Sequence, residues 1–160
     1  MLKLLKLIAA TILIASPAIA QTNINLGGVR ADTSAPVEVT ADSLNVDQDT
    51  GTAIFDGNVL IGQGALRLSA GKVEVIYNEA TGDISRLNAS GGVTFVTADE
   101  AAEAASAIYD LVAGTLTLTG DVLLTQGPSA ISAATMTINL ETGSAQMSGR
   151  VRTVLQQGSN

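Results

Sequence analysis

The sequence of 160 residues has no cysteine, histidine or tryptophan, and its only aromatic side chains are two phenylalanines and two tyrosines. The lack of cysteine excludes disulfides, thiolate metal ligands and a cysteine nucleophile. The lack of histidine removes the commonest general base and the commonest metal ligand. The many serines and threonines therefore have no partner base, and no acidic cluster has metal-ligand spacing. We predict a protein that is not an enzyme and that holds no metal and no cofactor.

Basic side chains are scarce as well, because eight Lys and Arg stand against fifteen Asp and Glu. Two of the lysines fall within residues 1–20, which contain no acid, so loss of this segment takes the net charge from −7 to −9. A surface with this balance repels nucleic acid and anionic headgroups at long range. We therefore expect no nucleic acid among the partners, and we expect any anionic lipid to be held mainly by its tails.

Residues 1–20 have the features of a secretory signal peptide. Lys3 and Lys6 give a positively charged start, residues 7–15 are apolar, and Ala18-Ile19-Ala20 is a small-x-small cleavage site. The apolar stretch is too short to cross a bilayer comfortably. We predict cleavage before Gln21, and the alternative is an uncleaved N-terminal anchor.

A pattern of two alternating apolar strands around a polar turn occurs four times in the rest of the chain. The second strand of each copy carries a Gly-x-Val unit, and these units begin at Gly57, Gly91, Gly120 and Gly149. They are therefore 34, 29 and 29 residues apart. A fixed period of about 30 residues is typical of repeat architectures, in which each unit buries its apolar face against its neighbours. The sequence thus predicts an all-β domain of about four repeats.

The first strand of each copy contains a break in its alternation. The apolar pattern slips by one residue in four places: Ala41–Leu44, Ala70–Val73, Ala104–Ala107 and Ala133–Met136. A strand of period two cannot take an odd step without a bulge or a bend. We predict four corners at which the chain passes from one sheet to another. The glycine of each Gly-x-Val unit is interpreted as allowing this coiling, with direct ligand contact as the alternative.

The repeats are expected to form one domain over residues 36–155. Residues 21–35 are polar and without a period, which predicts a flexible leader, and residues 156–160 are expected to be a frayed tail. Within the domain, the alanine-rich residues 98–107 are the one candidate for a helix, and we expect a loop or a single turn there.

The acidic stretch Asp47-x-Asp49-x-Gly51 resembles part of a calcium-binding loop. A complete loop needs further ligands and a distal glutamate, and the flanks here are predicted strands. We interpret the stretch as a turn.

The inner face of the predicted sheets is aliphatic, and this face is the functional candidate. One interpretation is an ordinary sandwich core that is packed to normal density. The other is a groove between splayed sheets that takes hydrocarbon chains, since each buried methylene is worth about 0.8 kcal/mol. The residues alone leave both interpretations open.

Several motifs, in this order and spacing, carry a family resemblance: Pro36-Val37-Glu38-Val39, Ala41-Asp42-Ser43-Leu44, Phe55-x-Gly57-Asn58-Val59, Ala70-Gly71-Lys72-Val73, Tyr109-Asp110-Leu111, Leu118-Thr119-Gly120-Asp121-Val122 and Gly149-Arg150-Val151-Arg152-Thr153-Val154. Together with the signal peptide they resemble the LptA/OstA-like family over about residues 33–155. The resemblance implies a β-jellyroll of antiparallel strands, open at both ends, whose apolar interior holds the acyl chains of lipopolysaccharide.

The resemblance also implies positions for two kinds of site. Four residues match family positions that line the lipid path: Val37, Val39, Phe95 and Tyr109. From the inward pattern we add three more: Leu44, Leu111 and Leu118. Pairing of edge strands with another chain is expected from five residues near the domain's ends: Val37, Val39, Arg150, Arg152 and Val154. For Arg150 and Arg152 the alternative is a solvated strand end.

The function implied by the resemblance is a periplasmic carrier in a Gram-negative bacterium. Protomers join head to tail and take lipopolysaccharide from the inner to the outer membrane. The implied partners are lipopolysaccharide, further copies of the chain, an inner-membrane OstA-like transporter component and an outer-membrane OstA-like assembly component. Three alternatives stay open: the membrane-anchored OstA-like component of the same pathway, a structural β-solenoid scaffold that polymerises without lipid, and a binding module for another apolar ligand.

Overall fold

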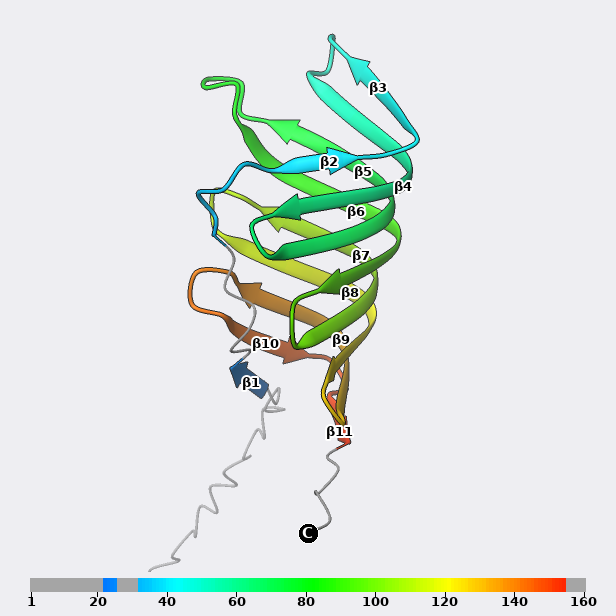
Figure 1. Ribbon diagram of the computed structural model, residues 1–160, viewed down its shortest axis with the longest axis vertical. Helices are drawn as coiled ribbons and strands as arrows, with labels where there is room; N and C mark the ends of the chain where they lie inside the picture. The colour runs from blue at the N-terminus through cyan, green and yellow to red at the C-terminus, as the bar shows by residue number, and fades with distance from the viewer. Residues whose placement is uncertain (1–21, 26–31, 155–160) are drawn as a thin grey trace, which may run out of the picture.

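The computed structural model describes residues 22–25 and 32–154 (Figure 1). Every regular element in these residues is a β-strand, so the all-β prediction is confirmed. The predicted signal peptide and the predicted tail lie outside the described residues. The strands are β1 (Thr22–Asn25), β2 (Glu38–Thr40), β3 (Ser43–Asp47), β4 (Thr52–Gln63), β5 (Leu66–Tyr77), β6 (Ile84–Val96), β7 (Glu100–Asp110), β8 (Thr115–Gln126), β9 (Ser129–Asn139), β10 (Ser144–Ser148) and β11 (Arg152–Val154).

Strands β4 to β9 form an antiparallel meander in which each strand pairs with the strands before and after it. β10 continues this order beyond β9, and β1 pairs with the outer edge of β10. Two strands share a partner at each end of the meander. β2 and β3 both pair with β4, whereas β10 and β11 both pair with β9.

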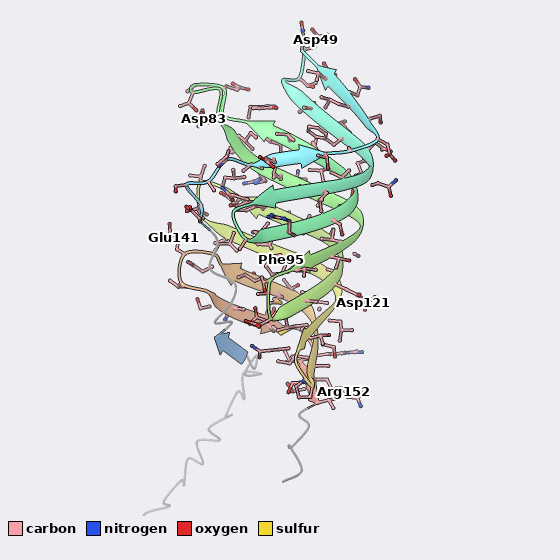
Figure 2. All side chains as sticks on the ribbon, viewed as in Figure 1. Asp49, Asp83, Phe95, Asp121, Glu141 and Arg152 are labelled. Carbon is pink, nitrogen blue, oxygen red and sulfur yellow. The ribbon has the colours of Figure 1, made fainter. Side chains whose placement is uncertain are left out.

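The long strands bend in their middle, and this bend divides the sheet into two halves. The part of the sheet that contains β1, β3 and β10 is called the first half-sheet, and the part that contains β2 and β11 is called the second half-sheet. The strand pairing shifts at the bend, for example between Asp56 and Val59 in β4 and between Thr119 and Val122 in β8. Asp121, labelled in Figure 2, lies at the bend, on the opposite side of the molecule from Asp83 and Glu141 in the turns.

The bends coincide with the predicted corners. At four corners a glycine and the next residue both have positive φ, as in Gly57 and Asn58 (81° and 47°) and Gly120 and Asp121 (88° and 47°). Two successive left-handed residues re-aim the strand, and glycine adopts this conformation without steric penalty. Space requires glycine as well, because a Cβ at Gly120 would lie 2.8 Å from the Cβ of Ala105. The interpretation of these glycines as corner residues is confirmed.

The expected loop at residues 98–107 is wrong, because this segment forms most of β7. Alanine has low strand propensity, but β7 is paired along both edges, with β6 and with β8. Tertiary pairing therefore overrides local preference. The leader prediction for residues 21–35 also differs from the structure at four residues, since Thr22–Asn25 form β1.

The inward side chains of the two half-sheets meet in a single apolar core. Most are aliphatic, and they come from every long strand of the meander. The largest side chains that are fully buried are Phe95, Ile61, Leu68, Leu87, Leu116, Leu118, Leu124, Met136, Ile138, Leu140 and Met147.

Candidate functional site

Three of the predicted lipid-contacting residues lie together in the closed part of the interior. Phe95, Tyr109 and Leu118 come from β6, β7 and β8, and their exposed fractions are 1%, 3% and 0%. They belong to the same packed core. In this conformation their side chains are in contact with protein atoms on all sides, so a ligand reaches them only if the half-sheets separate.

The other four predicted residues lie at the margins of the interior. Val37, Val39 and Leu111 are half-buried and pack against the core. Leu44 in β3 is 55% exposed. The exposure of the predicted residues therefore increases from the buried centre of the interior to an open end at β3.

This open end, which we call the mouth, contains a cleft of about 700 Å³. Its apolar lining comes from β3, β4 and β5: Leu44, Val46, Ala53, Phe55, Ile76 and Tyr77. Leu44 lies opposite Phe55 in the strand pairing, and Val46 lies opposite Ala53. Ala53 and Phe55 belong to the interior face of β4. Leu44 and Val46 therefore extend this apolar face onto β3, at the open end of the sheet. Phe55 and Val46 were not among the predicted residues, although their alternation with Leu44 and Ala53 was visible in the sequence.

The side of the molecule opposite the corners, where the turns of both half-sheets meet, is called the seam. A polar bridge between two described residues crosses it. Tyr109, at the seam end of β7 in the first half-sheet, donates a hydrogen bond from its hydroxyl to Oε1 of Gln63, at the end of β4 in the second half-sheet. Burial of the phenol raises the pKa of Tyr109 above its usual value.

The amide of Gln63 also holds the segment that leads into β2. Its Nε2 donates hydrogen bonds to the backbone carbonyls of Thr33 and Ala35, at 3.1 Å and 2.9 Å. Gln63 itself is buried. Residues 32–35, which we call the strap, are therefore fastened to the seam through a side chain that also fastens the two half-sheets to each other.

The predicted edge residues lie at the edges of the second half-sheet. Val39 is in β2, opposite Ile61, whereas Arg152 and Val154 are in β11, opposite Ser132 and Ala130. Val37 comes just before β2. The predicted edge residue Arg150 lies outside β11, because it has a φ of 48° and forms the fourth corner with Gly149.

The edges of the first half-sheet were missed by the sequence analysis. β3 has an open outer edge among the described residues, whereas the outer edge of β10 is covered by β1. The available signal was the short run Thr22-Asn23-Ile24-Asn25, which is too brief for period-two alternation to distinguish it from a polar leader. Within the parts of the chain that the structure describes, no group of three acidic residues is arranged to hold a metal ion, and no helix has the length and hydropathy of a membrane span.

Comparison with known proteins agrees with this geometry. Residues 38–144, more than half of the chain, match the sequence profile of the LptA/(LptD N-terminal domain) LPS transport protein family. The chain belongs to this family. An uncharacterized protein of Rhizobium meliloti (strain 1021) is 32% identical over 152 residues, which cover 88% of this chain and 82% of that protein.

The fold is shared with a solved structure of the same group. The crystal structure of LptH, the LptA-homologous periplasmic component of the lipopolysaccharide transport device from Pseudomonas aeruginosa, superposes with a TM-score of 0.70 at 17% identity. The match covers 79% of this chain and 99% of LptH. Family and fold together make this chain an LptA-like lipopolysaccharide transport component with a jellyroll fold, as the resemblance implied.

Proposed function

We propose that the chain is a periplasmic protein that binds lipopolysaccharide and carries it from the inner to the outer membrane within a head-to-tail protein bridge. The acyl chains are held between the two half-sheets. The observation that carries this proposal is the apolar interior face, which is packed at Phe95 and Leu118 but continues to an open mouth at Leu44 and Val46.

The mouth supplies the entry point for a hydrocarbon chain. Leu44, Val46 and Tyr77 are exposed to water in the isolated protein, so covering them with an acyl chain removes apolar surface from water on both partners. At about 0.8 kcal/mol for each buried methylene, several acyl chains supply strong binding without any ion pair. This agrees with an exterior in which acidic residues outnumber basic ones, since such a surface does not attract phosphates.

The two ends of the jellyroll support the bridge part of the proposal. One end carries β3 and β2, of five and three residues, and the other carries β10 and β11, of five and three residues, with β1 on the outer edge of β10. Contacts between unlike ends do not close on themselves and build open chains of protomers. By family membership, the terminal partners in such a chain are the OstA-like components of the inner and outer membranes.

A polymerising scaffold that takes no lipid is the second candidate function. It is favoured by the packing at the centre, where Phe95 and Leu118 have almost no exposed surface. The two functions differ in whether the half-sheets separate to admit a ligand.

Photo-crosslinking tests the proposal directly. A photoreactive residue replaces Phe95 at the centre, Phe55 at the mouth or, as control, Ile108, which alternates with the inward residues of β7 and is exposed on the outer face. We expect lipopolysaccharide adducts from positions 55 and 95 that unlabelled lipopolysaccharide removes, and none from position 108. Folded protein that gives no adduct at position 55 or position 95 would contradict lipid carriage and favour the scaffold.

A further inference from the structure

The edge of the first half-sheet at β10 is already occupied within the same chain. β1 pairs with β10 in antiparallel register, with Thr22 opposite Met147 and Asn25 opposite Ser144. At the other end of this half-sheet, the outer edge of β3 has no strand partner among the described residues. The two ends are therefore unequal: one edge is covered and the other is open.

β3 of a second copy fits the edge that β1 covers. β10 and β3 are both five residues long, whereas β1 has four. Direction agrees as well. β4 and β10 are separated by an even number of antiparallel pairings, so these two strands run in the same direction. β3 is antiparallel to β4 and β1 is antiparallel to β10, so β3 and β1 also run in the same direction as each other. In a second copy of the same orientation, β3 therefore approaches β10 in the direction that β1 now has.

The side-chain pattern of β3 also suits this position. Leu44 and Val46 alternate with polar residues and are both more than half exposed. On β10, Ala145 and Met147 alternate in the same way and face the core. If β3 pairs with β10, Leu44 and Val46 continue the apolar row of Ala145 and Met147, and surface that is exposed in the monomer becomes buried.

We infer that β1 is an intramolecular cap on β10, and that β3 of a second copy displaces it when two protomers join. The cap pairs with backbone N–H and C=O groups at the edge of β10 that would otherwise be free to pair with a strand of another chain. It therefore lowers the tendency of free protomers to associate. The second half-sheet has no such cap in the described residues, and its edges at β11 and β2 are open for first contact. This inference rests on the proposed head-to-tail bridge and adds the step that controls it.

A reversible disulfide tests the cap. Asn23 and Gln146 lie opposite each other in the β1–β10 register. Cα atoms of such pairs are about 4.5–5.5 Å apart, within the range that a disulfide spans. The chain has no cysteine of its own, so Asn23→Cys with Gln146→Cys allows a single bridge within one chain. The matched control is Ser43→Cys with Asp56→Cys, which locks β3 to β4 and leaves β10 unaffected.

Association of the secreted full chain is measured by sedimentation velocity over a range of concentrations. The oxidised Asn23→Cys/Gln146→Cys protein is expected to stay monomeric where its reduced form and both forms of the control associate. Association of the oxidised protein equal to that of its reduced form overturns the inference. So does a disulfide that forms between two chains, because β1 then pairs in trans.

Deletion of the cap is expected to change association in the opposite direction to the disulfide. Removal of Thr22–Asn25 is expected to shift half-association to at least about tenfold lower concentration, because the competent open state is no longer a minor population. An unchanged association curve overturns the inference. Lipopolysaccharide crosslinking at Phe55 in the oxidised monomer separates this result from the proposed function, because lipid binding does not depend on the cap.

Discussion

Tyr109 and Gln63, which are 46 residues apart in the sequence, form a hydrogen bond that joins the two half-sheets across the seam. The bond lies in an interior that is otherwise almost entirely apolar, and the same glutamine holds the strap through its amide. Loss of one partner therefore affects both the closure of the jellyroll and the attachment of the strap.

Gln63→Leu is expected to lower the free energy of unfolding by about 1–3 kcal/mol, because it leaves the buried Tyr109 hydroxyl without an acceptor. Urea denaturation measures the loss. Tyr109→Phe leaves Oε1 of Gln63 unpaired in the same way, so the double variant should lose less than the sum of the two single losses. Strict additivity in this cycle would show that the hydrogen bond does not stabilise the fold.

Alkaline pH is expected to lower the free energy of unfolding through ionisation of Tyr109. Because burial raises the pKa of its phenol above 10.0, the neutral form is favoured in the folded state. The stability contribution from this shift is complete below the unfolded pKa and is lost as the pH rises through the raised folded pKa. The free energy of unfolding should therefore fall more steeply above pH 10 in the wild type than in Tyr109→Phe. Equal slopes would exclude Tyr109 as the cause.

Leu44→Asp is expected to weaken lipopolysaccharide binding without unfolding the protein. Leu44 is exposed in the monomer, so the carboxylate stays in water until an acyl chain covers it. Loss of one leucine contact of about 1.5–3 kcal/mol corresponds to a reduction in affinity of about tenfold or more. Crosslinking from a photoreactive residue at position 55, over a range of lipopolysaccharide concentrations, measures the change in affinity. Val112→Asp, in the exposed turn after β7, is the control. A similar reduction in both variants would argue against a binding site at the mouth.

Gly149→Ala is expected to destabilise the fold by more than Gly82→Ala. Both glycines have positive φ, which penalises alanine by about 1–2 kcal/mol. At Gly149 the new Cβ would also lie 2.5 Å from the Cβ of Ala134, whereas nothing lies within 4 Å at Gly82. Thermal unfolding compares the two. Ala134→Gly should restore the stability of Gly149→Ala only in part, since it removes the clash and leaves the backbone strain.

Removal of residues 150–160 is expected to leave monomers that still bind lipid. The deletion removes β11, which forms one of the two open edges of the second half-sheet, while the mouth at the other end is unchanged. Light scattering follows association, and crosslinking from Phe55 follows lipid binding. Oligomers that persist with the same concentration dependence would show that β11 takes no part in the joint.

The repeat period and the slips in alternation were sufficient to predict the corners, because glycine at Gly57 and Gly120 is demanded both by positive φ and by space. The strand at residues 100–110 could not be predicted in the same way. Its alanines carry little strand preference, and only pairing on both edges determines their conformation.

The candidate site was predictable in part. The family resemblance placed Phe95 and inward alternation placed Leu118 in the interior, where both are buried, but neither signal shows whether that interior is open or closed. The bridge from Tyr109 to Gln63 depends on a separation of 46 residues that no local pattern encodes. The pairing of β1 with β10 depends on a still larger separation.

That last separation has a consequence for how the chain folds. Each hairpin of the meander pairs residues that are close in the sequence, so the strands can pair one after another along the chain. β1 is synthesised before all of them but can pair only when β10, near the end of the chain, has arrived. The first strand is thus placed only after the meander and β10 have formed.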